Sequence, residues 1–194
     1  KNFKPDVVIG TGGYVSGPLL LAATKLKIPT LIHEQNVFAG LTSKMLSDKV
    51  NTVCISFEES RKRFEKANNI VLTGNPIRSE LFELSYEDAR KRLGIDEKPF
   101  IVAFGGSLGA QRINEIVFSY MKNVARDRDD VLLELATGRN YYSDFSRAFV
   151  ENGLDKCSNL SMLEYIHDMH VRMSAADVMI CRAGAMTISE LAMM

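Results

Sequence analysis

The sequence predicts an α/β protein built from parallel sheets, and three observations lead to this class. Short apolar runs rich in β-branched residues alternate with longer amphipathic runs, which is the rhythm of strands followed by helices. Glycine-rich turns follow several of the apolar runs. The 194 residues are 46% hydrophobic, which is enough for one large or two small cores. We therefore expect helices on both faces of each sheet and ligands at the carboxyl ends of the strands.

The first part of the chain carries four predicted strands separated by helical segments. The strands are 6–10, 28–33, 52–56 and 70–72, and the helices are 19–26, 39–46 and 58–66. Residues 73–78 (TGNPIR) have turn chemistry throughout, so we place a boundary there and predict domains at 1–77 and 78–194. The chain opens directly on a strand and stops early in a helix. We therefore expect both domains to be incomplete within these 194 residues.

The second part begins with a helix whose start resembles a capping box. Ser85 is followed three residues later by Asp88, and the helical run ends at Gly94. The strands that follow are predicted at 100–104, 131–136, 160–164 and 178–182, and the helices at 113–121, 141–150, 168–175 and 186–194.

The most informative stretch is 100–112 (FIVAFGGSLGAQR), which predicts a strand, a glycine turn and a helix. Gly105, Gly106 and Gly109 allow a tight turn, and unpaired N–H groups at the start of a helix attract anions. Ser107 adds a hydroxyl group. The stretch therefore predicts a phosphate or diphosphate site, and close packing of strand and helix is the alternative use of these glycines.

The spacing of this loop excludes two common nucleotide sites. A Walker loop ends in Gly-Lys-Ser/Thr, whereas this loop ends at Gly109, Ala110 and Gln111. A dinucleotide fingerprint needs Gly-x-Gly-x-x-Gly and an acidic residue after the next strand, whereas the next strand here ends in Ala136, Thr137 and Gly138. ATP and NAD are therefore poor candidates.

Charge and cysteine content exclude several further classes. Lys plus Arg and Asp plus Glu both number 24, which argues against nucleic acid as a partner. The basic runs at 61–63 and 90–92 stand beside acidic residues, so we interpret both as solvated helix faces. Three isolated cysteines indicate a reducing cytoplasm. No signal peptide is visible in these residues, and no apolar run reaches the roughly 18 residues that span a membrane.

We expect neither a metal nor a cofactor. No paired-aspartate motif of the kind that holds a metal ion is evident in the sequence. His167 and His170 are three residues apart and are the alternative metal pair, but no third ligand of the right type stands near them in the sequence.

Five blocks of sequence share an order and spacing that point to one family. The blocks are 12–18 (GGYVSGP), 33–36 (HEQN) with 39–40 (AG), 74–78 (GNPIR), 105–110 (GGSLGA) and 181–190 (CRAGAMTISE). Together they resemble the MurG family of UDP-N-acetylglucosamine transferases. The resemblance implies a GT-B fold, in which two Rossmann-like domains face a cleft. The N-terminal domain would serve the acceptor and the membrane, and the C-terminal domain would hold the UDP-sugar.

The resemblance also implies a reaction and a place. This glycosyltransferase would transfer GlcNAc with inversion from UDP-GlcNAc to the 4-hydroxyl of MurNAc in lipid I (undecaprenyl-pyrophosphoryl-MurNAc-pentapeptide). The product is lipid II, a precursor of peptidoglycan, made at the cytoplasmic face of the cell membrane by a peripheral protein. The family's proposed catalytic histidine would lie before Lys1, and its sugar-reading glutamine would lie after Met194. We therefore cannot assign a catalytic base within the chain, and we expect no turnover from these residues alone.

The resemblance assigns individual residues to the two substrates. The donor-binding residues it implies are Asn36, Arg78, Gly106, Ser107, Ile166, Ala185, Met186, Thr187, Ile188, Ser189 and Glu190. Candidates for the acceptor side or the cleft are Gly13, Tyr14 and His33.

Most of these residues have a plainer alternative role. Glu190 either accepts hydrogen bonds from a ribose diol or closes a capping box with Thr187. Arg78 either neutralises a phosphate or is an ordinary surface arginine. Asn36 either contacts a sugar or shapes its turn. Tyr14 belongs to the core or to the cleft wall. His33 either contacts substrate or has its ring nitrogens hydrogen-bonded to other protein groups.

Two alternatives for the whole protein remain open. One is another UDP-sugar enzyme of the same fold, either a lipid glycosyltransferase or a UDP-GlcNAc epimerase, which would use carboxylates such as Glu34 and Glu190. Another is a non-catalytic half that needs a partner chain.

The helix 19–26, with Lys25 and Lys27, has two possible roles. It either lies against anionic lipid headgroups or simply covers a sheet, and we favour the second role.

Overall fold

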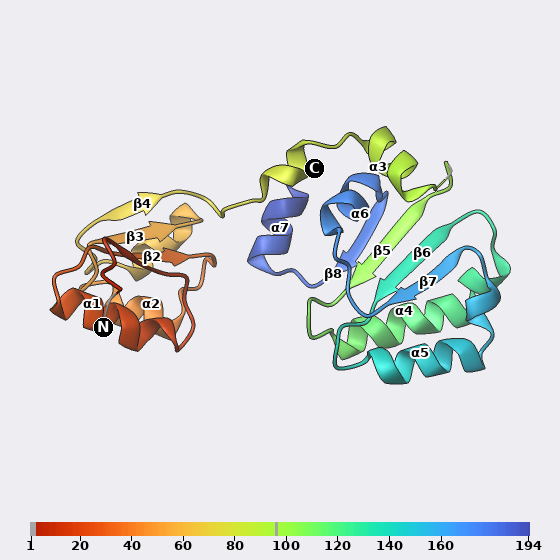
Figure 1. The fold of residues 1–194 in the computed structure, drawn as a ribbon, viewed down its shortest axis with the longest axis horizontal. Helices are drawn as coiled ribbons and strands as arrows, with labels where there is room; N and C mark the ends of the chain where they lie inside the picture. Colours follow the sequence, from red (N-terminus) through yellow and green to blue (C-terminus); the bar gives the residue numbers. More distant parts are fainter. Residues whose placement is uncertain (1–2, 96) are drawn as a thin grey trace. The chain divides into compact units, whose positions relative to one another are not determined.

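The computed structural model describes residues 3–95 and 97–194 and divides the chain into two compact units. The first unit ends at Pro76 and the second begins at Ile77. Each unit contains a four-stranded sheet in which all paired strands run parallel (Figure 1). The predicted α/β class with two parallel sheets is confirmed.

The first unit has the strand order β1-β2-β3-β4. Its strands are β1 (Val8–Gly10), β2 (Thr30–Glu34), β3 (Thr52–Ile55) and β4 (Ile70–Leu72). Helices α1 (Ser16–Lys25) and α2 (Leu41–Leu46) lie on one side of the sheet (Figure 1). Helix α1 begins before Pro18 because the first helical turn tolerates proline. The opposite sheet face leaves Ile9 59% exposed, so the predicted covering of both faces does not hold here within the described residues.

Helix α1 covers the sheet, which is one of the two alternatives that the sequence left open. Leu20 and Ala23 are buried against the sheet, as a covering helix requires. Leu19 and Leu26 are 60% and 72% exposed on the same segment. No helix in the described ranges has the length and apolar character needed to cross a membrane.

The predicted helix at 58–66 is wrong in type. The structure has a 3-10 helix, η1 (Glu58–Arg63), at this position. The Ser60 hydroxyl donates to the carbonyl of Phe57, and Arg61 pairs with Glu58, so two side chains favour a spacing of three residues. Phe64 then enters the core and ends the helix.

The second unit has the strand order β7-β6-β5-β8. Its strands are β5 (Phe100–Phe104), β6 (Leu132–Ala136), β7 (Leu160–Leu163) and β8 (Val178–Cys181). Its α-helices are α3 (Tyr86–Leu93), α4 (Gln111–Asn123), α5 (Tyr142–Glu151), α6 (Met169–Ala175) and α7 (Ala185–Leu191). Its 3-10 helices are η2 (Ser79–Phe82), η3 (Ala125–Asp127) and η4 (Leu154–Lys156).

The position of β5 within this sheet determines where a ligand can bind. Helices α4 and α5 cover one face, and α3 and α6 cover the other (Figure 1). After β5, the chain adds β6 and β7 on one side of this strand and then returns to add β8 on its other side. The strand order therefore has a topological switch point at β5. Ligands of open α/β sheets bind at the carboxyl side of such a point. The loops that follow β5 and β8 meet there.

Helix α3 begins and ends as predicted. The Ser85 hydroxyl accepts a hydrogen bond from the N–H of Asp88 at 3.1 Å, and Gly94 takes the left-handed conformation at the end.

The prediction that 90–92 is a solvated face is wrong for Arg90. Its side chain is only 7% exposed and donates to the carbonyls of Ala175 and Lys98 and to the carboxylate of Asp177. Burial alone would raise the pKa of Asp177, but hydrogen bonds from the Phe100 N–H, Tyr86 and Arg90 hold this pKa below its ordinary value. Arg90 and Asp177 thus bind α3 to the beginning of β5.

Candidate functional site

A cavity of about 160 Å³ lies at the carboxyl end of the second sheet. Its lining brings together five of the predicted donor-binding residues, which are Arg78, Gly106, Ser107, Ile166 and Glu190. These residues are far apart in the sequence and come from the segment before α3 and from the segments after β5, β7 and β8. The cavity therefore has the place and the composition expected of a ligand site in this fold.

The glycine loop after β5 lines this cavity with Gly106 and Ser107. Gly106 has φ +88°, and its carbonyl accepts a hydrogen bond from the N–H of Gly109 at 3.0 Å. Within 3–95 and 97–194, the N–H groups of Gly106, Ser107 and Leu108 donate to no protein acceptor. Unpaired N–H groups in such a turn are suited to an anion such as a phosphate.

The glycines of the loop serve two different purposes. A Cβ on Gly105 would lie 2.2 Å from the Ala110 nitrogen, and one on Gly109 would lie 2.1 Å from the Thr137 carbonyl oxygen. Close packing therefore explains these two positions. A Cβ on Gly106 would instead lie 2.9 Å from a guanidinium nitrogen of Arg182. Of these three glycines, Gly106 is thus the one that lies beside a charged side chain.

Arg182 is a site residue that the sequence analysis did not single out. It follows β8 directly, and its guanidinium group lies beside Gly106. The described part of the chain provides no hydrogen bond or ion pair for this guanidinium group, which makes it an available cation. The signal was present, because Arg182 stands in the block 181–190. The pairing of β8 with β5, which brings Arg182 to the glycine loop, could not be read from local patterns.

Arg78 and Glu190 form an ion pair in the cavity wall. A guanidinium nitrogen of Arg78 lies 3.4 Å from a carboxylate oxygen of Glu190, whose side chain is 15% exposed. The capping-box alternative for Glu190 is wrong. Helix α7 starts at Ala185 after Gly184, so Thr187 already lies inside the helix and cannot be its cap.

The segment after β7 forms another wall of the cavity. The side chain of Ile166 is buried in the core between the sheet and α6, and among the described residues no acceptor is found for its N–H group. Tyr165 and His167 stack edge to face with ring centroids 5.1 Å apart. A larger cavity, of about 500 Å³, shares Ser107, Tyr165 and His167 with the first and adds Arg139. The site can therefore hold a ligand longer than one phosphate group.

Other predicted residues of the second unit lie outside this lining. Ala185, Met186, Thr187, Ile188 and Ser189 form the first turns of α7, and only Glu190 of this helix is among the described lining residues. The described residues also contain no group of three potential metal ligands around His167 and His170 or elsewhere.

In the first unit, a cavity of about 250 Å³ is lined by Gly13, Tyr14, Glu34 and Asn36. Tyr14 is 88% exposed, so the core alternative for this residue is wrong. Glu34 is buried, and its carboxylate accepts hydrogen bonds from the backbone and side-chain nitrogens of Asn36 and from the N–H of Gly40. Asn36 therefore shapes its turn through Glu34.

His33 has protein partners on both ring nitrogens. Nε2 lies 2.9 Å from the carbonyl oxygen of Gly74, and Nδ1 lies 3.0 Å from the side-chain nitrogen of Gln35. This geometry favours the interpretation of His33 as a satisfied histidine.

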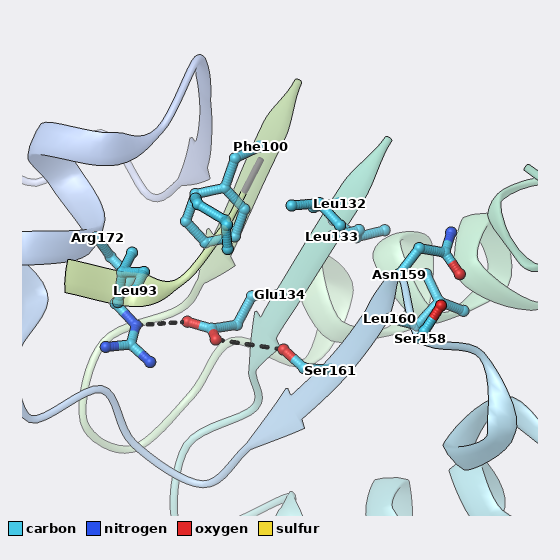
Figure 2. Close-up of a pocket in the computed structure, with 11 residues that line it drawn as sticks. Leu93, Phe100, Leu132, Leu133, Glu134, Ser158, Asn159, Leu160, Ser161 and Arg172 are labelled. Atoms are coloured by element: carbon cyan, nitrogen blue, oxygen red, sulfur yellow. Dashed lines mark hydrogen bonds and ion pairs between the residues drawn. The ribbon is translucent and has the colours of Figure 1, made fainter. Parts of the chain in front are cut away.

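A third cavity of the second unit, of about 190 Å³, is drawn in Figure 2. Its walls include Phe100, Leu132 and Leu160, which are the first residues of β5, β6 and β7. It therefore lies toward the amino ends of the strands, and none of the predicted site residues lines it.

Comparison with known proteins gives matches over most of the sequence. The model of the glycosyltransferase family 28 C-terminal domain matches residues 100–194, and that of the family 28 N-terminal domain matches residues 1–55. A relative from Acetivibrio thermocellus is 50% identical over 98% of this chain and 51% of its own length. One from Caldanaerobacter subterraneus is 48% identical over 98% of this chain and 52% of its own length.

Both relatives are named UDP-N-acetylglucosamine--N-acetylmuramyl-(pentapeptide) pyrophosphoryl-undecaprenol N-acetylglucosamine transferase. Among solved structures, MurG of Acinetobacter baumannii is 34% identical, with a TM-score of 0.61 over 96% of this chain and 49% of that one. The chain thus spans about half the length of the relatives it matches.

Proposed function

The chain belongs to glycosyltransferase family 28, and on this premise we propose that its second unit binds the uridine diphosphate part of a UDP-sugar. The observation that carries the proposal is the glycine loop. Among the described residues, the N–H groups of Gly106, Ser107 and Leu108 are unpaired, and the unpaired guanidinium group of Arg182 lies beside Gly106. This combination of amide donors and a guanidinium group suits the two negative phosphates of a nucleotide diphosphate.

The proposed reaction of the whole protein is the transfer named for its relatives, with the stereochemistry and product that the family resemblance implies. GlcNAc would pass from UDP-GlcNAc to the MurNAc 4-hydroxyl of lipid I, with inversion, and lipid II would form. UDP is the leaving group, so negative charge grows on its phosphates as the glycosidic bond breaks. The loop amides, Arg182 and Arg78 would stabilise this charge, and the carboxylate of Glu190 would accept hydrogen bonds from the ribose. We assign no base to this chain.

The carboxylates argue against an epimerase. Such an enzyme needs free acid and base groups in its cavity. Both carboxylate oxygens of Glu34 accept hydrogen bonds from N–H groups, and Glu190 is paired with Arg78. A sugar transferase needs neither group as a proton carrier.

Titration calorimetry with four ligands tests this proposal. We expect UDP, UDP-GlcNAc and UDP-glucose to bind the second unit and NAD not to bind, because the loop lacks the dinucleotide pattern. Binding of NAD, or failure of all three uridine ligands to bind, would overturn the proposal. Transfer of GlcNAc to lipid I by this chain alone would contradict the expectation that the base lies elsewhere.

We also propose that the first unit meets the acceptor at the cytoplasmic face of the cell membrane. The exposed Leu19 and Leu26, with Lys25 and Lys27 beside them, suit an anionic lipid surface. Pelleting with anionic vesicles should decrease when both lysines are changed to glutamate. Equal pelleting of the two forms would remove the membrane part of the proposal.

A further inference from the structure

A buried carboxylate lies in the middle of the second sheet. Glu134 is on β6, and its side chain is only 10% exposed. Arg172 of α6 donates from Nε to one carboxylate oxygen of Glu134 at 3.0 Å, and the Ser161 hydroxyl donates to the other at 3.2 Å (Figure 2). Both oxygens of the buried carboxylate are therefore satisfied.

Arg172 extends this contact toward the donor cavity. A terminal nitrogen of the same guanidinium group donates to the carboxylate of Asp168, four residues earlier. Asp168 directly follows Ile166 and His167, which line the cavity, and it directly precedes α6. Three charged side chains, Glu134, Arg172 and Asp168, thus connect the centre of the sheet with the cavity wall.

Stability alone does not account for this chain of charges. A buried ion pair is on average no more stabilising than well-packed apolar side chains, because both ions lose their hydration. Here the pair also borders the cavity of about 190 Å³ shown in Figure 2, so the site is not tightly filled. A planar guanidinium group that bonds two carboxylates does, however, fix a direction that apolar packing cannot fix.

We propose that Glu134, Arg172 and Asp168 position the segment 165–167 for binding of the nucleoside part of the donor, which makes them positioning residues. The inference rests on the proposed function. The diphosphate would be held by the loop after β5, in which none of the three residues takes part. The rest of the nucleotide would then lie against the other wall, which is formed by Tyr165, Ile166 and His167. Asp168 follows His167 directly and would anchor that end of the wall through Arg172.

The test is the replacement Asp168→Asn, assayed with two ligands. This side chain is 41% exposed, so its loss should change the midpoint of thermal unfolding little. We expect UDP to bind about five- to tenfold more weakly, because the wall loses a charge-assisted bond that fixes it. Inorganic pyrophosphate lacks the nucleoside that would lie against the wall 165–167, so its affinity should change by less than about twofold.

Two further variants distinguish a specific effect on the position of segment 165–167 from a general loss of stability. Asp130→Asn is the matched control, since it removes the same group from the exposed pair of Arg128 and Asp130, and it should leave both affinities unchanged. The double variant Glu134→Leu with Arg172→Met keeps the core apolar and should fold with nearly unchanged stability. Its affinity for UDP should nevertheless be reduced as in Asp168→Asn.

The outcomes distinguish the inference from the proposed function. UDP affinity unchanged in Asp168→Asn, or equal losses for UDP and pyrophosphate, would overturn the inference while donor binding stands. Full UDP affinity in the double variant would also overturn it. If the unaltered chain does not bind UDP at all, the proposed function itself fails and the inference fails with it.

Discussion

Replacing Gly106 with alanine is expected to weaken UDP binding by roughly 30-fold, or about 2 kcal/mol. Gly106 has φ +88°, a conformation that costs a residue with a Cβ about 1–2 kcal/mol. The new methyl group would also lie 2.9 Å from the guanidinium group of Arg182. The loop amides and the cation would both leave the positions proposed to hold the diphosphate. Titration calorimetry with UDP measures the loss.

Gly153→Ala is the matched control for this prediction. Gly153 also has a positive φ, at +70°, and a Cβ there would meet no atom within 4 Å. It lies before η4, outside the lining of the cavity, so alanine imposes the same backbone strain without touching the site. We expect lower stability but unchanged UDP affinity. Equal weakening of binding in both variants would show that strain, and not the site, explains the loss.

Replacing Arg90 with methionine is expected to lower the free energy of unfolding by about 3–5 kcal/mol at pH 7. The change leaves the carboxylate of Asp177 and the carbonyls of Lys98 and Ala175 without a buried cation. Urea unfolding followed by circular dichroism measures the difference. Arg128→Met removes a cation from the exposed pair with Asp130 and should lower the free energy of unfolding far less, because solvent screens an exposed pair. Similar losses in the two variants would contradict the role of Arg90.

The cost of Arg90→Met should also depend on pH, because Asp177 is a carboxylate whose pKa is lowered in the folded protein. Its contribution to stability is complete above the unfolded pKa of about 3.9 and is lost as the pH falls through the folded value. Once the carboxyl group of Asp177 is protonated, the variant no longer leaves an unpaired negative charge. The difference between the two proteins should therefore shrink toward pH 3. A difference that stays constant from pH 7 to pH 3 would show that Asp177 is not the partner that matters.

Features with a local cause were predictable from the sequence. The parallel α/β class, the Ser85 cap and the glycine turn after β5 all follow from short patterns, and the structure confirms them. The predicted resemblance to the MurG family is confirmed as well. The assignment of Asn36, Arg78 and the other donor-binding residues stays a prediction.

Features that depend on tertiary packing were missed or mistaken. Arg90 stands in a basic run that reads as solvated, and only the packing of α3 against the start of β5 buries it. Arg182 reaches Gly106 because β8 pairs with β5, which no local pattern specifies. Glu190 matched a capping box, but α7 begins at Ala185, and its N-cap, Gly184, lies three residues before the expected cap at Thr187. In each case the deciding contact joins segments distant in sequence or depends on where a helix begins.

The most direct test of the diphosphate site is the amide NMR spectrum of the ¹⁵N-labelled chain during titration with UDP, with uridine as the comparison. If the loop holds the phosphates, the N–H signals of Gly106, Ser107 and Leu108 shift strongly with UDP and remain near their free positions with uridine. If UDP binds while these three signals stay in place, or if the shifts gather around Glu134 and Ser161, the loop does not bind the diphosphate.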